Sequence, residues 1–83
     1  MSVRVVFLGA LAERFGARER LVEAPGEGIT LEELKARAAG GQEHLLAALA
    51  PPVRAAVDRE IAAGDARVRP GQEVAFFPLF SGG

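Results

Sequence analysis

The sequence contains no cysteine, tryptophan or tyrosine and has only one histidine, His44. Without cysteine the chain cannot form disulfides, thiolate nucleophiles, Fe–S clusters or cysteine-based zinc sites. One histidine is too few for a histidine-based metal site and excludes nearly every triad with an imidazole base. We therefore expect no metal site and no conventional active site built from side chains, and we interpret His44 as a solvated residue.

The charges are few and balanced, with ten basic and eleven acidic residues and a net charge of -1. This balance predicts no contact with a nucleic-acid backbone, and the five phenylalanines are not interleaved with basic residues as in base-stacking surfaces. The apolar run at residues 45–50 is far shorter than the ~20 residues of a membrane-spanning helix. Residues 4–12 imitate a secretory signal but are shorter than the typical ~15–30 residues. We expect a cytoplasmic protein without a membrane partner.

A chain of 83 residues forms one domain, and domains near this size bury only about 60% of their unfolded surface. Residues 3–8 and 73–77 are apolar on both faces, apart from Arg4 near one end, which predicts two central strands buried on both sides. Residues 20–24 form a second strand, and residues 11–15 form a short helix that ends at Gly16.

The sequence Thr30-x-x-Glu33 is a capping box, so the main helix begins at Leu31 and ends at Gly40. Residues 42–50 predict a second helical piece, whose inward residues are Leu45, Leu46 and Leu49. Alternation over residues 53–57 predicts a strand, a short return strand follows at residues 60–62, and Pro70-Gly71 suits a type II turn. The fold class is α+β: a ubiquitin-like β-grasp with a mixed sheet of four to five strands, covered by one main helix.

The chain ends in Gly82-Gly83, five residues beyond Pro78. Because proline has no N–H for a strand ladder, we expect a β-grasp domain over residues 1–78 and a flexible, projecting tail over residues 79–83. Five extended residues reach at most about 17 Å. A glycine pair can enter a narrow channel and present the Gly83 carboxylate to another protein's active site. A carboxylate is a poor electrophile, so it must first be activated, for example as an adenylate.

Residues 72–78 (QEVAFFP), followed by Gly82-Gly83, resemble the carboxy-terminal signature of the small, sulfur-carrier subunits of molybdopterin synthase. The resemblance extends over the whole chain, through the opening VRVVF, the segment LAERFG and the turn PGQEV. Members of that family often have proline, asparagine and an acidic residue where this chain has Leu79, Asp58 and Gln72. None of these differences touches the terminal carboxylate.

The resemblance implies that an adenylating enzyme of the ubiquitin-activating type uses ATP and Mg²⁺ to convert the Gly83 carboxylate to an acyl-adenylate. A sulfur donor protein would then form the thiocarboxylate, with Gly82 supplying clearance. The charged carrier would donate sulfur to cyclic pyranopterin monophosphate on the large subunit of molybdopterin synthase, in a heterotetramer. The family's catalytic side chains belong to that large subunit, so this chain would bind no cofactor and would not be an enzyme on its own.

Three other functions stay open on the sequence. A sulfur carrier for thiazole synthesis or tRNA thiolation would use the same tail chemistry with another acceptor. A ubiquitin-like modifier would form adducts with lysines of other proteins. A simple interaction domain would keep its activity after deletion of the tail.

Strand alternation also predicts where partners dock. One face of the central strands carries Val5, Phe7, Val74 and Phe76, which we expect in the core. Three large apolar residues are then left on the open face, where they form a docking patch: Leu8, Ile61 and Phe77. The tail would add its own contacts with the partner through Pro78, Leu79, Phe80 and Ser81.

Overall fold

The computed structural model describes residues 1–78 and contains three helices and seven strands in that range. The helices are α1 (Ala10–Phe15), α2 (Leu31–Ala39) and α3 (Glu43–Ala48). The strands are β1 (Ser2–Phe7), β2 (Glu19–Glu23), β3 (Ile29–Thr30), β4 (Arg54–Val57), β5 (Glu60–Ile61), β6 (Arg67–Val68) and β7 (Glu73–Phe77). No helix within residues 1–78 has the length and apolar character needed to cross a membrane.

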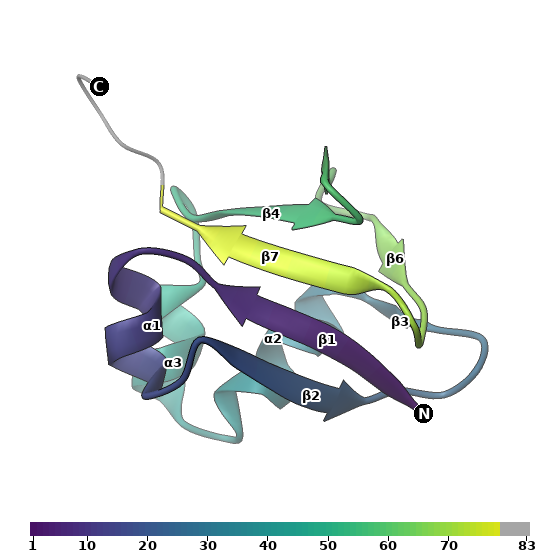
Figure 1. Cartoon of the computed structure of the whole chain (residues 1–83), viewed down its shortest axis with the longest axis horizontal. Coiled ribbons are helices and arrows are strands. Elements are labelled where there is room, and N and C mark those ends of the chain that lie inside the picture. Colours follow the sequence, from purple (N-terminus) through teal and green to yellow (C-terminus); the bar gives the residue numbers. More distant parts are fainter. Residues whose placement is uncertain (79–83) are drawn as a thin grey trace.

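Five strands form one mixed sheet in the order β2-β1-β7-β4-β5, with the first and last strands of the chain at its centre (Figure 1). Strands β1 and β7 run parallel, whereas the other neighbours are antiparallel. This arrangement confirms the predicted β-grasp, with the terminal strands paired in mid-sheet. Strands β3 and β6 form a separate two-stranded ladder that the sequence pattern did not predict.

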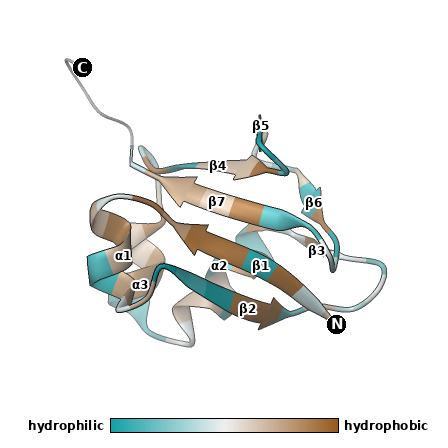
Figure 2. Cartoon of the chain, viewed as in Figure 1, coloured by the Kyte–Doolittle hydropathy of each residue, from teal (hydrophilic) through white to brown (hydrophobic). Residues whose placement is uncertain are grey.

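The core lies between the sheet and the helices, which all pack on one side of it (Figures 1 and 2). The expected core residues of the central strands, Val5, Phe7, Val74 and Phe76, are all at most 2% exposed. The rings of Phe7 and Phe15 stack with their centroids 4.1 Å apart, which joins β1 to α1.

The prediction that the central strands are buried on both sides is wrong. Burial alternates along β1 and β7, so Val6, Ala75 and Phe77 are only half-buried, and Leu8 lies beyond the end of β1 and is exposed. Apolar residues on both faces of a strand usually indicate cover on both sides, but here helices cover only one. The second apolar face is therefore left at the surface.

The capping box of the main helix is confirmed in one of its two hydrogen bonds. The Glu33 N–H donates to Thr30 Oγ1 at 3.0 Å, and α2 ends where Gly40 takes the left-handed conformation. The Glu33 carboxylate instead lies 3.8 Å from the Arg37 guanidinium, one turn along the helix. Exposed pairs of this kind stabilise helices only slightly.

The prediction that Leu46 points inward is also wrong. Leu45 and Leu49 are buried, as expected, whereas Leu46 is 40% exposed. Leu45 and Leu49 are four residues apart and share one stripe of the helix, while Leu46 is turned by about 100° from Leu45. Helix α3 is shorter than predicted, and His44 on it is exposed, in agreement with the sequence.

Asp58 ties the turn between β4 and β5 to the beginning of β7. Its Oδ1 accepts a hydrogen bond from the Glu73 N–H at 2.9 Å, and its Oδ2 accepts one from Gln72 Nε2 at 3.0 Å. These bonds, chiefly the one from Glu73, hold the pKa of Asp58 below its ordinary value of 3.8. Asp58 and Arg59 both have positive φ, at 48° and 73°, as the predicted tight turn requires.

We expect replacement of Asp58 by asparagine to weaken the dependence of stability on pH. Because the folded pKa of Asp58 lies below its unfolded value, its carboxylate stabilises the fold above about pH 4, and this stabilisation is lost as pH falls further. Asp58→Asn should be less stable than the wild type at neutral pH, and the difference should be much smaller at an acid pH below the folded pKa of Asp58. Asparagine tolerates positive φ as aspartate does, so the conformational free energy of the turn should be similar in the variant and the wild type.

Urea unfolding followed by circular dichroism at both pH values measures this effect. Asp65→Asn is the control, because Asp65 is also an exposed turn carboxylate. A difference between Asp58→Asn and the wild type that stayed constant with pH would show that the charge of Asp58 does not stabilise the fold.

Candidate functional site: the open face of the sheet and the base of the tail

The face of the sheet opposite the helices carries a row of apolar side chains that crosses four strands. In the strand register Val6 pairs with Ala75, Ala75 with Ala56, and Ala56 with Ile61. Paired residues lie on the same face of a sheet, so the row is continuous from β1 to β5. Val6, Ala75 and Ala56 are half-buried, and Ile61 is 55% exposed.

Two larger side chains extend this row toward the end of β7. Leu8 follows β1 and is 44% exposed, and Phe77 is the last residue of β7 and is half-buried. Together the six residues form what we call the open-face patch: Val6, Leu8, Ala56, Ile61, Ala75 and Phe77. The structure thus places the three expected docking residues on one face, with Leu8 and Phe77 on adjacent segments and Ile61 on the far side of β4.

Charged residues mark the limit of the patch on the same face. The Arg4 guanidinium lies 3.3 Å from the Glu19 carboxylate and 3.5 Å from the Glu73 carboxylate, which links β1 to both of its neighbours. Arg54 is exposed and pairs with Phe77 in the strand register. One half of the open face therefore carries these ion pairs together with the exposed Leu21, which pairs with Arg4, and the half nearest the end of β7 is apolar with a cation beside it.

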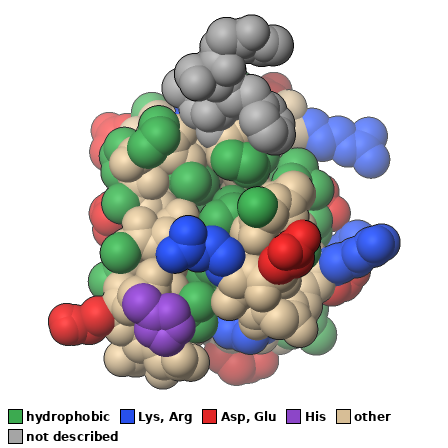
Figure 3. Space-filling view, turned by 90° about the vertical axis from the view of Figure 1, so that its left-hand side faces the viewer, with side chains coloured by type: hydrophobic (Ala, Val, Ile, Leu, Met, Phe, Trp, Pro, Cys, Tyr) green, Lys and Arg blue, Asp and Glu red, His purple; other side chains and the backbone are tan. Residues whose placement is uncertain are grey.

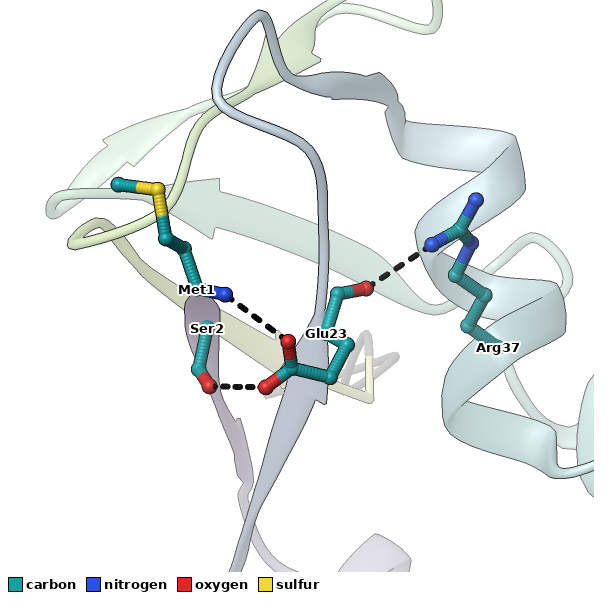
Figure 4. A network of polar contacts seen from close by, with 4 residues as sticks. All are labelled: Met1, Ser2, Glu23 and Arg37. Atoms are coloured by element: carbon teal, nitrogen blue, oxygen red, sulfur yellow. Dashed lines mark hydrogen bonds and ion pairs between the residues drawn. The ribbon is translucent and has the colours of Figure 1, made fainter.

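A polar network of Met1, Ser2, Glu23 and Arg37 lies at the beginning of β1, the end that is farthest from Leu8 (Figure 4). The Met1 ammonium lies 2.9 Å from Glu23 Oε1, and the Ser2 hydroxyl donates to Oε2 of the same carboxylate at 2.8 Å. These contacts lower the pKa of Glu23, and the contact with the Met1 ammonium has the largest effect. Arg37 of α2 donates to the Glu23 carbonyl at 3.0 Å. The network therefore lies at the end of β1 opposite to Leu8 and the end of β7.

A hollow of about 600 Å³ lies beside Leu8, between the end of β1 and α1. It is lined by small apolar residues, including Gly9 and Ala12, and by the charged Glu13 and Arg18. Figure 3 shows this end of the molecule, on which hydrophobic side chains lie among basic and acidic ones. The hollow borders the patch, because Val6 and Leu8 both line it.

The predicted reactive residues lie outside the described part of the chain. Gly82 and Gly83, and the expected tail contacts Leu79, Phe80 and Ser81, all fall within residues 79–83. Pro78 is described and half-buried, and β7 ends at Phe77, so strand pairing stops where the sequence predicted it. What the structure defines is the base from which the tail starts.

Residues 1–78 contain no group of three or more histidine or acidic residues that could hold a metal ion. The larger of the two hollows, of about 840 Å³, lies between α2, α3 and β4, and its lining includes Arg54. Its charged lining residues include Lys35, which is paired with Glu32 at 3.2 Å.

Four further residues of this site were not expected from the sequence to contact partners. Val6, Ala56 and Ala75 complete the patch, and strand alternation already predicts that Val6 and Ala75 share a face with Leu8 and Phe77. The place of Arg54 opposite Phe77 depends on the antiparallel pairing of β4 with β7, which no local pattern specifies.

Comparison with known proteins agrees with this geometry. The model of the ThiS family matches residues 5–83 of the chain. A crystal structure of SAMP1 from Haloferax volcanii has 24% identity and a TM-score of 0.84, with the whole of both chains covered. A protein of Pyrococcus furiosus, described as subunit 1 of a molybdopterin converting factor, has 20% identity and a TM-score of 0.80, covering 96% of this chain and 99% of the other. A search of the curated proteins found no match.

The solved structures share the β-grasp fold with this chain over nearly its whole length. The family match is the more specific finding, because it covers most of the domain and continues through the Gly-Gly end. It identifies a small protein of the sulfur-carrier type, and such carriers are not catalysts themselves. The chain belongs to the ThiS family.

Proposed function

We propose that this chain is the sulfur carrier of molybdopterin synthesis, with residues 1–78 as the docking domain and residues 79–83 as the tail that carries the reacting group. The observation that carries this proposal is that the family match runs to Gly83, five residues beyond Pro78, which directly follows the Phe76-Phe77 end of β7. We place the reaction in the cytoplasm, with ATP and Mg²⁺ bound by the activating enzyme rather than by this chain.

In the proposed reaction the Gly83 carboxylate attacks the α-phosphate of ATP, which forms the acyl-adenylate and releases pyrophosphate. Hydrosulfide (HS⁻) supplied by a donor protein then attacks the acyl carbon, AMP leaves with the electron pair of the C–O bond, and loss of the S–H proton leaves a thiocarboxylate at the chain end. The activation step is needed because a carboxylate is anionic, with an ordinary pKa near 3.5, and is therefore a poor electrophile. Gly82 and Gly83 have no side chains, which lets the end enter a narrow site.

The described residues would hold the domain on its partners while the tail reacts. An exposed apolar patch beside a reactive end is suited to docking, because its burial supplies binding free energy without side-chain chemistry. The open-face patch would bind the activating enzyme first and the large subunit of the synthase later, in a heterotetramer. The large subunit would supply the catalytic side chains for transfer of sulfur to cyclic pyranopterin monophosphate.

Intact-mass measurement tests the proposal. We expect incubation with ATP, Mg²⁺, the adenylating enzyme and a sulfur source to replace one oxygen of the chain by sulfur, and we expect no change when ATP is omitted. Addition of the large subunit and cyclic pyranopterin monophosphate should return the mass to its starting value and yield molybdopterin. The carrier function is wrong if no cognate partner produces the oxygen-to-sulfur increment.

The family match supports the other carrier functions as well, so the acceptor must be identified separately. A thiocarboxylate that is consumed during thiazole synthesis or tRNA thiolation, and not by cyclic pyranopterin monophosphate, would assign the chain to a sibling pathway. Adducts of Gly83 with lysines of other proteins would identify a modifier. The similarity of the fold to SAMP1 of Haloferax volcanii is the reason to test for such lysine adducts.

A further inference from the structure

The tail begins at a point where β7 loses a neighbour. The Leu8 N–H donates to the Phe76 carbonyl at 3.0 Å, and after this bond the chain turns away at Gly9 into α1. On its other side β7 pairs with β4 only as far as Phe77, opposite Arg54, where β4 begins. Pro78 has no N–H and cannot extend either ladder. Its position must therefore depend on side-chain packing.

The Pro78 ring lies beside the turn at Gly9. A Cβ atom placed on Gly9 would lie 3.6 Å from Pro78 Cγ and 3.8 Å from Pro78 Cδ, which are van der Waals distances. Gly9 has φ 58° and ψ −138°, a conformation that residues with a Cβ rarely adopt. The turn therefore requires glycine, and this turn forms the surface next to Pro78.

We propose that Gly9 is a positioning residue: its turn supports Pro78 and so limits the directions in which the tail leaves the sheet. The inference rests on the proposed function, in which an enzyme bound to the open-face patch must receive the Gly83 carboxylate. Five residues can span about 17 Å, so a small rotation at Pro78 moves the chain end by several ångströms. A restricted origin raises the effective concentration of the carboxylate in the bound enzyme's site.

Gly9→Ala tests the proposal, with Gly16→Ala as the control for a strained glycine at the other end of α1. Both glycines have positive φ, 58° and 72°, but alanine is strained more at Gly9, whose ψ is −138°, than at Gly16, whose ψ of 18° is left-handed helical, so activity is measured where both variants are folded. A Cβ on Gly16 has nothing within 4 Å, whereas one on Gly9 faces Pro78. We expect both variants to lower the unfolding midpoint, but only Gly9→Ala to lower kcat for adenylation, by roughly tenfold with KM unchanged.

A second variant shows whether Gly9 acts through Pro78. Pro78→Ala removes the ring and should lower kcat in the same way, also without a change in KM. In the double variant Gly9→Ala/Pro78→Ala we expect little further loss, because two residues that act through one contact are not additive. Equal kcat values for Gly9→Ala and Gly16→Ala, or independent effects of Gly9→Ala and Pro78→Ala, would overturn the proposal.

A distance measurement gives a readout that needs no activity. The chain has no cysteine, so spin labels can be placed at Ser81→Cys in the tail and at Glu43→Cys on α3, where Glu43 is exposed. We expect the distribution of label distances to broaden or shift in Gly9→Ala and to stay as in the wild type in Gly16→Ala. An unchanged distribution in Gly9→Ala would refute the positioning role. A changed distribution in a chain that no enzyme adenylates would instead refute the proposed function.

Discussion

A variant with one alanine added after Gly83 should form no detectable thiocarboxylate, whereas its fold and stability stay as in the wild type. The reason is that the reacting group is the terminal carboxylate itself. One added residue moves that group by about 3.5 Å and places a Cβ beside it. Since a misplacement of 1 Å can cost about 10²-fold in rate, we expect at least that loss in adenylation.

The expected lack of effect on stability follows from the described structure. Strand pairing ends at Phe77, and the buried core is built from residues 3–76. Urea unfolding should therefore give the same midpoint for the extended chain and the wild type. Gly83→Ala is the matched variant, because it adds the same methyl group but keeps the length, and it should retain more activity than the extended chain.

Adenylation is measured by ATP–pyrophosphate exchange, and the thiocarboxylate is measured by intact mass. Proteolytic removal of the added residue should restore both activities, which excludes damage to the protein. Normal thiocarboxylate formation by the extended chain would mean that the reacting group is not the carboxylate at the chain end.

The fold could be predicted from the sequence where local patterns and capping agreed. The box Thr30-x-x-Glu33 placed the start of α2, and the turn Pro70-Gly71 is confirmed by a positive φ at Gly71 and a 3.1 Å bond from the Gln72 N–H to the Arg69 carbonyl. Strands β3 and β6 were missed because each has two residues, too few for a period of two. Their pairing joins segments nearly 40 residues apart, and no local pattern reports such a contact.

The candidate site was predictable to a similar degree. Alternation around Phe76 and Phe77 was sufficient to assign one to the core and the other to the open face, and the structure agrees. The contact between Gly9 and Pro78 could not be derived in this way. It arises because β1 and β7 are parallel neighbours whose carboxyl ends meet at one edge of the sheet.

We expect Phe76→Ala and Phe77→Ala, which alter adjacent residues of one strand, to have opposite effects on folding and on binding. Phe76 is fully buried, with its ring centroid 6.4 Å from that of Phe7. Its truncation should lower the free energy of unfolding by about 3–5 kcal/mol, since it removes buried contacts and leaves a cavity. Phe77 lies on the uncovered face, so Phe77→Ala should destabilise the isolated domain much less.

For binding to the partners we expect the opposite order, with Phe77→Ala losing more affinity than Phe76→Ala. An aromatic anchor at the centre of an interface typically contributes about 1–3 kcal/mol, so Phe77→Ala should weaken the complexes with the activating enzyme and with the large subunit by that amount. Circular dichroism in urea measures the stability of each variant, and calorimetric titration measures each affinity at a temperature where both variants are folded. Equal losses of stability, with partner affinity unchanged in Phe77→Ala, would show that the open face of the sheet is not the docking surface.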